Sequence, residues 1–441
     1  AWTYQHFSGL KEMPQFGWDS VTVPGAVHAW VTLSKKFGKL PFADLFVPGI
    51  EYAHKGFLVS PITAYRWSEA QVKYQEYPDF CKTFLPMGKS PLSGELFCCP
   101  YQAATLAEIA ESHAESFYRG DLANKIVECA RSSGGAITRE DLANHNSEWV
   151  NPISIDYQNS CLHEIPPNGQ GLAALMALGI LRHHDLKKYP VDSADSVHLQ
   201  IEAMKIAFAE AHRHIADPEY MTVPSSDFLQ PAFLAHRTRK IQMDRASKCF
   251  SMIPTDHGTV YLSTADKDGM MVSFIQSNYL GFGSGIVIPN TGISMQNRGF
   301  GFAIEKGHPN CVDGGKRPYH TIIPGFVTHK DQPVMSFGVM GGHMQPQGHV
   351  QIMVRIFDYG QNPQTACDAP RWMVNQDSSV SIETGFSSDV IKELRNRGHK
   401  VLPRFYHSLS GDFGGAQLIF CLDDGYCAAS DPRKDGQAVG F

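Results

Sequence analysis

Apolar residues recur at helical spacing in several stretches, most of them in the first half of the chain. Over residues 195–212 they stand three to four positions apart behind Ser193, a candidate N-cap, and this pattern predicts an amphipathic helix. The ranges 104–117 and 122–131 show the same spacing, and a further helix is predicted over 387–397. The first half is therefore expected to be rich in helix.

From Thr259 the pattern changes to short runs rich in β-branched and aromatic residues. Residues 259–265 and 270–277 are two such runs, and Asp266-Lys-Asp-Gly269 between them is a strong hairpin signal. Further short strands are predicted over 285–288, 321–327, 334–339 and 416–422. Helices combined with antiparallel strands indicate an α+β fold, and the composition shift near 250–259 is its only predicted internal boundary.

The loop of this hairpin decides which residues face each other. If Gly269 takes the left-handed position of a three-residue loop, Thr259 lies directly opposite Ser277, with Cβ atoms about 5 Å apart. A four-residue loop shifts the register by one and leaves the two as diagonal neighbours. Their hydroxyls can therefore hydrogen-bond, although such pairs are also common on the surfaces of sheets.

Glycines at two places give the hydroxyl pair a chemical interpretation. Gly258 directly precedes Thr259, and glycine tolerates the backbone strain that attack by a hydroxyl on the preceding carbonyl requires. Gly341 and Gly342 follow a β-rich run, where exposed N–H groups could face a developing oxyanion. The alternative for this glycine pair is a plain turn at the end of a strand.

Charge and cysteine content exclude several classes of partner. The formal net charge of the 441 residues is −6, which gives no footprint for nucleic acid or anionic lipid, and no apolar run approaches the roughly 20 residues of a membrane span. The ten cysteines include no C-x-x-C, so neither a metal nor a cofactor is expected. Scattered cysteines favour a cytoplasmic location. A periplasmic or secreted location is the alternative, because the chain begins at Ala1 without Met.

Ordered motifs along almost the whole chain resemble the γ-glutamyltranspeptidase superfamily. Those that resemble its small subunit are Gly258-Thr-Val-Tyr-Leu-Ser-Thr-Ala-Asp-Lys-Asp-Gly269, Phe282-Gly-Ser-Gly-Ile-Val287, Lys316-Arg-Pro318, Gly341-Gly342 and Ala429-Ser-Asp-Pro-Arg433. Those that resemble its large subunit are Val23-Pro-Gly-Ala-Val27, Phe117-Tyr-Arg-Gly120, Gly134-Gly-Ala-Ile-Thr138, Asp141-Leu142 and Pro166-Pro167.

The resemblance implies a four-layer αββα N-terminal-nucleophile fold that cleaves itself between Gly258 and Thr259. Residues 1–258 would form the large subunit and residues 259–441 the small subunit of a heterodimer. By position, Thr259 matches the family's nucleophile, Ser277 a threonine that hydrogen-bonds it, and Gly341 and Gly342 the oxyanion hole. The family's glutamate-binding arginine lies upstream of Val23-Pro-Gly25, so the large subunit is expected to lack the family's N-terminal segment.

Departures from the family pattern concern the substrate. The acidic Met-Asp-Asp-Phe stretch that binds the glutamate ammonium is replaced by Gly299-Phe300-Gly301-Phe302, and the paired serines are replaced by His320-Thr321. The residues expected to bind substrate are Tyr279, Phe300, Gly301, His320, Thr321 and His343. Together with Pro167-Asn-Gly-Gln-Gly171 and Gly342-His-Met-Gln-Pro-Gln-Gly348, these residues resemble the branch that contains cephalosporin acylases.

The expected function is hydrolysis of a small-molecule N-acyl amide through a threonine-linked acyl-enzyme, as in cephalosporin acylases. One alternative is γ-glutamyl transfer or glutathione hydrolysis. A second is a non-catalytic binding protein that kept the fold.

Overall fold

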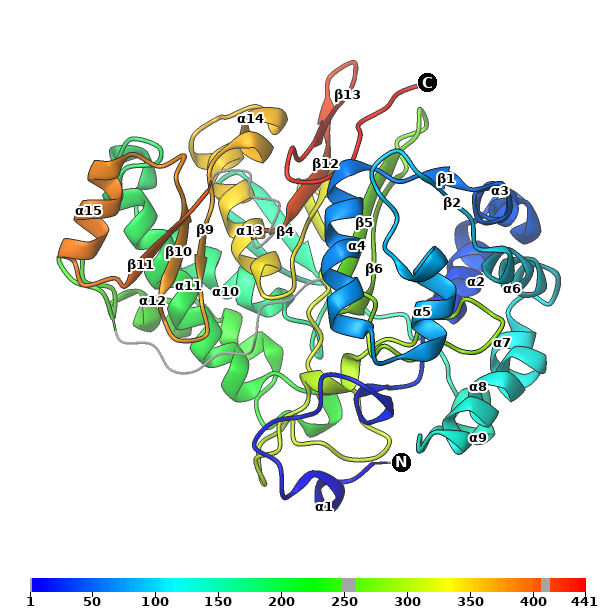
Figure 1. The fold of residues 1–441 in the computed structure, drawn as a ribbon. Helices are drawn as coiled ribbons and strands as arrows, with labels where there is room; N and C mark the ends of the chain where they lie inside the picture. The colour runs from blue at the N-terminus through cyan, green and yellow to red at the C-terminus, as the bar shows by residue number, and fades with distance from the viewer. Residues whose placement is uncertain (1, 248–257, 406–412) are drawn as a thin grey trace. The chain divides into compact units, whose positions relative to one another are not determined.

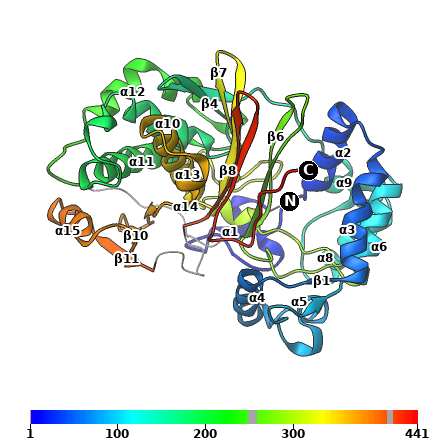
Figure 2. The ribbon, with the colours of Figure 1, turned by 90° about the horizontal axis from the view of Figure 1, so that it is seen from above.

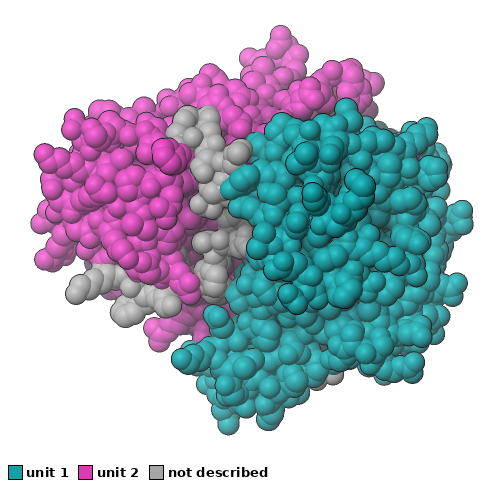
Figure 3. All heavy atoms as spheres, viewed as in Figure 1, with its two compact units in different colours: residues 1–149, 278–306, 311–316 teal, residues 150–277, 307–310, 317–441 magenta. Residues whose placement is uncertain are grey.

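A computed structural model describes most of the chain, with two internal gaps. The described residues are 2–247, 258–405 and 413–441. They form two compact units, drawn in different colours in Figure 3. Unit 1 consists of Ala1–Trp149, Asn278–Lys306 and Cys311–Lys316. Unit 2 consists of Val150–Ser277, Gly307–Asn310 and Arg317–Phe441. The composition shift near 250–259 lies mostly outside the described residues.

Unit 1 is mainly helical (Figure 1). Its longer helices are α2 (Ala26–Phe37), α3 (Val47–Lys55), α4 (Pro61–Tyr74), α5 (Pro78–Phe84), α6 (Pro100–Glu111) and α8 (Asp121–Ser132). Two short strands, β1 (Phe57–Leu58) and β2 (Leu96–Phe97), pair antiparallel. The helix predicted over 122–131 is therefore confirmed as α8.

The single helix predicted over 104–117 is wrong, because the chain turns inside that range. Helix α6 ends at Glu111, and α7 (Glu115–Arg119) begins after His113 and Ala114, which have left-handed φ values of 48° and 69°. The apolar spacing continues across this turn because Ile109 of α6 and Phe117 of α7 belong to the same buried cluster. The spacing of apolar residues thus indicates which side chains are buried, but it does not reveal where one helix ends and the next begins.

Unit 2 is built around a six-stranded antiparallel sheet in the order β13-β12-β8-β7-β4-β3. Its strands are β3 (Ile153–Tyr157), β4 (Ser160–Glu164), β7 (Gly325–His329), β8 (Gln332–Met340), β12 (Gly415–Leu422) and β13 (Gly425–Ser430). A smaller sheet has the order β11-β10-β9, with strands β9 (Trp372–Val374), β10 (Val380–Glu383) and β11 (Val401–Arg404). Strands are thus confirmed over 334–339 and 416–422, and over 325–327 of the range 321–327.

Helices cover one face of the large sheet, and a hairpin covers the other. Unit 2 contains α10 (Gly171–Leu181), α11 (Ala194–His214), α12 (Pro231–Thr238), α13 (Met344–Met353), α14 (Pro363–Asp368) and α15 (Ser388–Asn396). Figure 2 shows α10 and α13 on one side of β8 and the hairpin strand β6 (Met271–Tyr279) on the other. The contacts agree, since Gly348 of α13 lies against the Val339 side chain, while Gly338 lies against the Tyr261 ring of β5 (Gly258–Ala265). Unit 2 therefore contains three layers in the order helix, sheet, sheet.

Two helix predictions in unit 2 are confirmed together with their caps. Helix α11 covers the range 195–212, and the Ser193 hydroxyl accepts the Ser196 N–H at its start. Helix α15 covers most of 387–397 behind a capping Ser387. The strand predicted over 285–288 in unit 1 is reduced to an isolated antiparallel bridge between Val287 and Ser294, because Gly283 and Gly285 have left-handed φ and turn the chain at its start. No helix within the described part of the chain has the length and apolar character needed to cross a membrane.

Candidate active site

The hairpin of β5 and β6 brings the two predicted hydroxyls together. Gly269 has a left-handed φ of 89°, and the Asp266 N–H donates to the Met270 carbonyl at 3.0 Å, which are the features of a three-residue loop. The Oγ1 of Thr259 lies 3.0 Å from the Oγ of Ser277. The direct-opposition register is therefore confirmed, and the diagonal alternative is excluded.

Ser277 also contacts the peptide bond that precedes Thr259. Its hydroxyl donates to the Gly258 carbonyl oxygen at 2.8 Å. Because a serine hydroxyl has one hydrogen, Ser277 accepts the hydrogen bond from Thr259. A donor chain thus runs from the Thr259 hydroxyl through Ser277 to the Gly258 carbonyl. All three residues are only half-buried, so water has access to this end of the hairpin.

The predicted glycine pair forms a turn between β8 and the N-terminus of α13. Gly341 has a φ of 131° and Gly342 a φ of 55°, values that favour glycine. A Cβ atom at Gly341 would lie 2.9 Å from the Gly414 Cα and 3.0 Å from the Met344 Cβ. The N-terminus of a helix carries partial positive charge from its unpaired N–H groups. The turn therefore places two glycines at the positively polarised start of α13, and their role as an oxyanion hole stays a prediction.

Three predicted substrate-binding residues belong to unit 1 and are buried there. Tyr279 and Phe300 are 2% and 7% exposed, and their ring centroids are 6.1 Å apart. The Arg298 guanidinium lies 4.3 Å above the Tyr279 ring in a cation–π contact. Burial lowers the pKa of Arg298 to about 10 and raises that of Tyr279 to about 12. Gly301 ends the short helix that carries Arg298 and Phe300.

The other three, His320, Thr321 and His343, belong to unit 2. Thr321 and His343 are 1% and 2% exposed, whereas His320 is half-buried. The His343 ring stacks on Tyr319 at 5.9 Å between centroids and lies 5.7 Å from His212. Burial is the main cause that lowers the pKa of His212 to about 4, so the His212 ring is uncharged at neutral pH. The structure thus brings these three residues next to the glycine turn.

Sequence reasoning did not single out Gln170, which is fully buried between these segments. Its side-chain amide donates to the Gly342 carbonyl at 2.8 Å and to the Thr321 carbonyl, and its carbonyl accepts from the Tyr319 hydroxyl at 3.2 Å. The only signal was its place in the motif Pro167-Asn-Gly-Gln-Gly171. That motif does not reveal partners about 150 residues further along the chain.

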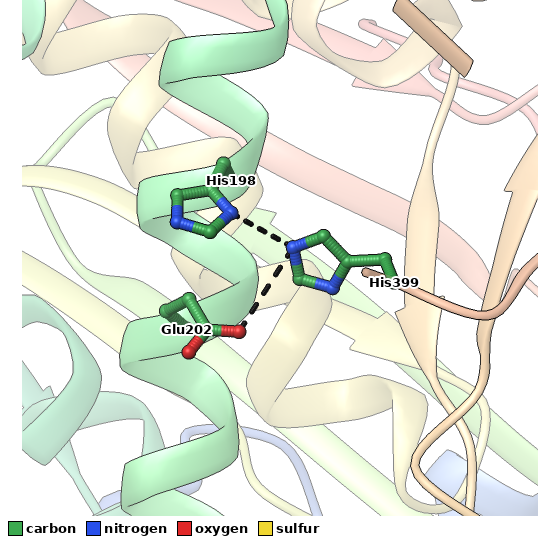
Figure 4. A group of neighbouring side chains, drawn as sticks. All are labelled: His198, Glu202 and His399. Atoms are coloured by element: carbon green, nitrogen blue, oxygen red, sulfur yellow. Dashed lines mark hydrogen bonds and ion pairs between the residues drawn. The ribbon is translucent and has the colours of Figure 1, made fainter. Parts of the chain in front are cut away.

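Among the described residues, one group of side chains is close enough to share a metal ion: His198, Glu202 and His399 (Figure 4). His198 and Glu202 are four residues apart on α11, but His399 comes from a distant segment, so spacing in the sequence did not reveal the group. All three are buried, and the His198 Nδ1 lies 2.8 Å from the His399 Nε2.

The hydrogen bonds of this group occupy the nitrogen and oxygen atoms that would have to bind a metal ion. The Lys205 ammonium, which can only donate, lies 3.2 Å from the His399 Nδ1 and 2.9 Å from a Glu202 oxygen. His399 therefore accepts at Nδ1 and donates from Nε2 to His198, whose Nε2 donates to the Gln242 carbonyl at 2.8 Å. A metal-bound histidine donates from its second nitrogen, whereas the second nitrogen of His399 faces an ammonium. The group does not fit a metal.

Comparisons with known proteins agree on one family. The family model for gamma-glutamyltranspeptidase matches residues 1–441. The glutathione hydrolase-like YwrD proenzyme of Bacillus subtilis (strain 168) is 33% identical over 450 residues, covering 99% of this chain and 83% of that protein. The oxamate amidohydrolase proenzyme of Klebsiella pneumoniae subsp. pneumoniae is 33% identical over 451 residues, covering 100% of this chain and 84% of that protein.

The structural comparison confirms the predicted fold class. The crystal structure of a cephalosporin acylase from Bacillus halodurans is 44% identical, with a TM-score of 0.94, and the match covers 100% of this chain and 82% of that one. The α+β N-terminal-nucleophile hydrolase fold expected from the sequence is thus the fold of this chain.

Proposed function

The chain belongs to the gamma-glutamyltranspeptidase family, and we propose that its Thr259 first cuts the chain and then hydrolyses N-acyl amides. Membership of the family makes the protein an amidohydrolase or acyltransferase, since its relatives include hydrolases and acylases named as proenzymes. The observation that carries the proposal is the donor chain from Thr259 through Ser277 to the Gly258 carbonyl.

In the proposed self-cleavage, the Thr259 Oγ1 attacks the carbonyl carbon of Gly258. Ser277 takes up the Thr259 hydroxyl proton as it passes its own proton to the Gly258 oxygen, so a neutral tetrahedral intermediate forms. The C–N bond then breaks as the proton on the Gly258 oxygen moves to the Thr259 nitrogen, which becomes an amine, and Gly258 is left as an ester on the Thr259 oxygen. Water hydrolyses this ester and leaves residues 1–258 and 259–441 as two subunits.

Cleavage supplies the base for the second reaction. The new α-amino group of Thr259 has a reference pKa of about 7.7–8.0 and can accept the Thr259 hydroxyl proton when this oxygen attacks a substrate amide. The N–H groups of Gly341 and Gly342 would stabilise the oxyanion of the tetrahedral intermediate. The amine leaving group takes a proton, an acyl ester forms on Thr259, and water or an acceptor amine releases the acyl group.

The proposed substrate is an acyl amide without an α-ammonium group, such as a glutaryl or other dicarboxylic acyl amide. Phe300 and Gly301 replace the acidic residues of the transpeptidases, so a γ-glutamyl ammonium would lose hydration without gaining a carboxylate partner at these positions. The named relatives support two candidates, because they include both acylases and glutathione hydrolases. Glutathione hydrolysis is therefore the second candidate function.

Two measurements test the proposal. Intact-mass analysis of purified active protein should show a fragment that begins at Thr259, and active protein that remains one chain would contradict the mechanism. In steady-state assays, kcat/KM for glutaryl-p-nitroanilide should exceed that for γ-glutamyl-p-nitroanilide by at least about tenfold, the equivalent of about 1.4 kcal/mol. An equal or reversed preference would favour glutathione hydrolysis.

A further inference from the structure

The side chain of Gln170 joins the glycine turn to the segment that contains Tyr319 and Thr321. It immediately precedes α10 and is fully buried. One side-chain nitrogen donates to two backbone carbonyls, those of Gly342 and Thr321, and the side-chain oxygen accepts from the Tyr319 hydroxyl. The Gln170 backbone N–H also donates to the His320 carbonyl at 3.0 Å. The amide is therefore held in one orientation, with its donor toward the turn.

The bond to Gly342 matters because adjacent glycines have little conformational preference of their own. The Gly341 carbonyl accepts the Met344 N–H at 2.9 Å, which fixes one peptide plane of the turn. The Gly342 carbonyl accepts the Gln345 N–H at a longer 3.2 Å and the Gln170 amide at 2.8 Å. Gln170 thus supplies the shorter of the two bonds that orient the Gly342–His343 peptide plane, while the bond from Met344 orients the plane that contains the Gly342 N–H.

We propose that Gln170 is a positioning residue that anchors the Gly342–His343 peptide, and with it the backbone of the turn from which the N–H groups of Gly341 and Gly342 project toward an oxyanion. The inference rests on the proposed function, in which these N–H groups stabilise the tetrahedral intermediate. Donors to an oxyanion act mainly because they are oriented before charge develops. Loss of the tether should therefore slow the chemical step and leave binding of the uncharged ground-state amide nearly unchanged.

Substitution by glutamate gives a signature that a purely structural role does not. Gln170→Glu keeps the shape of the side chain, but an ionised carboxylate would face the carbonyl oxygens of Gly342 and Thr321 with no hydrogen to donate. When protonated, the same group donates one O–H bond. The ratio of kcat for Gln170→Glu to kcat for wild type should therefore rise as pH falls. Gln170→Met has no donor in any protonation state, so its ratio should not change with pH.

Gln351 provides a matched control. It is 3% exposed, its side-chain nitrogen donates to the carbonyls of Gln347 and Trp372, and its oxygen accepts the Trp372 N–H. Gln351→Glu therefore places the same negative charge next to two backbone carbonyls, those of Gln347 and Trp372, at a site on α13 about two helical turns beyond Gly342. It should leave kcat within about twofold of wild type.

The experiment uses the self-cleaved protein and an acyl-p-nitroanilide over a range of pH. We expect kcat of Gln170→Glu and Gln170→Met to fall by about 10²–10³ at alkaline pH, the range for loss of one oxyanion donor, with KM within about threefold. Tyr319→Phe removes only the hydroxyl that orients Gln170 and should lower kcat by about three- to tenfold, which tests the proposal if the Gln170 variants do not fold.

The possible failures are distinguishable. A wild-type protein that neither cuts itself nor hydrolyses an anilide contradicts the proposed function before any variant is compared. If wild type is active, the inference on Gln170 is overturned by a kcat within twofold in Gln170→Glu and Tyr319→Phe. Losses confined to KM, or losses equal to those of Gln351→Glu, would overturn it as well.

Discussion

Two chains of hydrogen bonds in unit 2 are similar in form and different in consequence. One runs from the Thr259 hydroxyl through Ser277 to the Gly258 carbonyl. The other runs from Lys205 through His399 and His198 to the Gln242 carbonyl. In each chain, every group donates a hydrogen bond to the next group, and the last group donates to a backbone carbonyl. The first chain ends on the Gly258 carbonyl, and the residue that starts the chain, Thr259, follows Gly258 directly and can attack it. The second chain ends on the Gln242 carbonyl, which is distant in the sequence from its starting residue, Lys205.

Burial and charge separate the two chains further. The hydroxyl chain is half-buried and contains no ionised group. The imidazole chain is buried, and its ammonium is neutralised by Glu202, whose second oxygen accepts the Ser247 N–H at 2.9 Å. It therefore ties α11 to residues 242–247 and to His399, just before β11. In the proposed function, the hydroxyl chain is reactive because it ends on a peptide bond that Thr259 can attack and that water can reach, while complete satisfaction of its donors makes the imidazole chain structural.

The largest expected effect is loss of the first residue of the reactive chain. Thr259→Ala should abolish self-cleavage and amide hydrolysis, because it removes the hydroxyl that attacks the Gly258 carbonyl carbon, whereas the Ser277 hydroxyl is engaged as a donor to the carbonyl oxygen. Denaturing electrophoresis should show one band of the full length. Thr264→Ala, an exposed threonine of the same strand, is the control and should give two bands. Cleavage of Thr259→Ala at the same rate as wild type would remove Thr259 from the mechanism.

The second prediction concerns the middle of the reactive chain. Ser277→Ala removes the acceptor of the Thr259 proton and the donor to Gly258, so kcat should fall by roughly 10²–10⁴ with little change in KM. Ser273→Ala is the control on the same strand, because its hydroxyl bonds Tyr261 and the Phe337 carbonyl. It should leave kcat unchanged. If kcat of Ser277→Ala is within twofold of wild type, Ser277 has no role in proton transfer.

The chain through Thr259 and Ser277 could be predicted from the sequence because its members are local. Thr259 and Ser277 belong to one hairpin, so the loop signal at Asp266–Gly269 was enough to place their hydroxyls within reach of each other, either directly opposite or as diagonal neighbours. The imidazole chain joins residues of α11 to His399, about 200 positions away, and no periodic pattern carries that information. The role of Gln170 was not predicted for the same reason, because its hydrogen-bond partners lie on segments that are distant in the sequence and come next to it only in the folded protein.

The same distinction explains the fold predictions. Helices α8, α11 and α15 were predicted because apolar spacing and an N-cap or stop signal lie within each segment. The break between α6 and α7 was missed because both helices bury side chains in one cluster. The segment 285–288 was predicted as a strand because it is apolar, but only Val287 forms a β-bridge, and left-handed glycines set the path of the chain around it. Burial by tertiary contacts overrides local β-propensity there.

The third prediction tests the structural chain through its ion pair. Glu202→Gln leaves the Lys205 ammonium buried beside a neutral amide, and breaking a buried pair in this way costs about 3–5 kcal/mol of unfolding free energy. The control is Glu51→Gln, which breaks the exposed pair with Lys55 and should leave the free energy of unfolding nearly unchanged. Urea unfolding measures both. Equal, small costs would show that the buried cluster contributes no more than a surface ion pair.

The smallest expected effect is the pH dependence of stability that the imidazole chain produces. Burial is the main cause that lowers the pKa of His399 to about 2, with Lys205 as the next cause, and burial also lowers the pKa of His198. Both rings are thus neutral in the folded state, whereas in the unfolded state they bind protons below a pKa of about 6.5. Their contribution is complete above that pH and is lost as pH falls below it toward the folded pKa.

One such histidine should cost about 1.6 kcal/mol of unfolding free energy between pH 6.5 and pH 5, from the titration of the unfolded chain alone. His399→Gln removes that titration, so the free energy of unfolding should fall less steeply with acid by about this amount, even though the variant is less stable at every pH. The slope, not the absolute value, is therefore the measurement. His54→Gln, at an exposed histidine, should keep the wild-type slope. An unchanged slope in His399→Gln would mean that His399 already carries a proton in the folded protein. The assignment of donors from Lys205 to Gln242 would then be wrong, and the contrast with the Thr259–Ser277 chain would no longer be one between a reactive relay and a fully satisfied one.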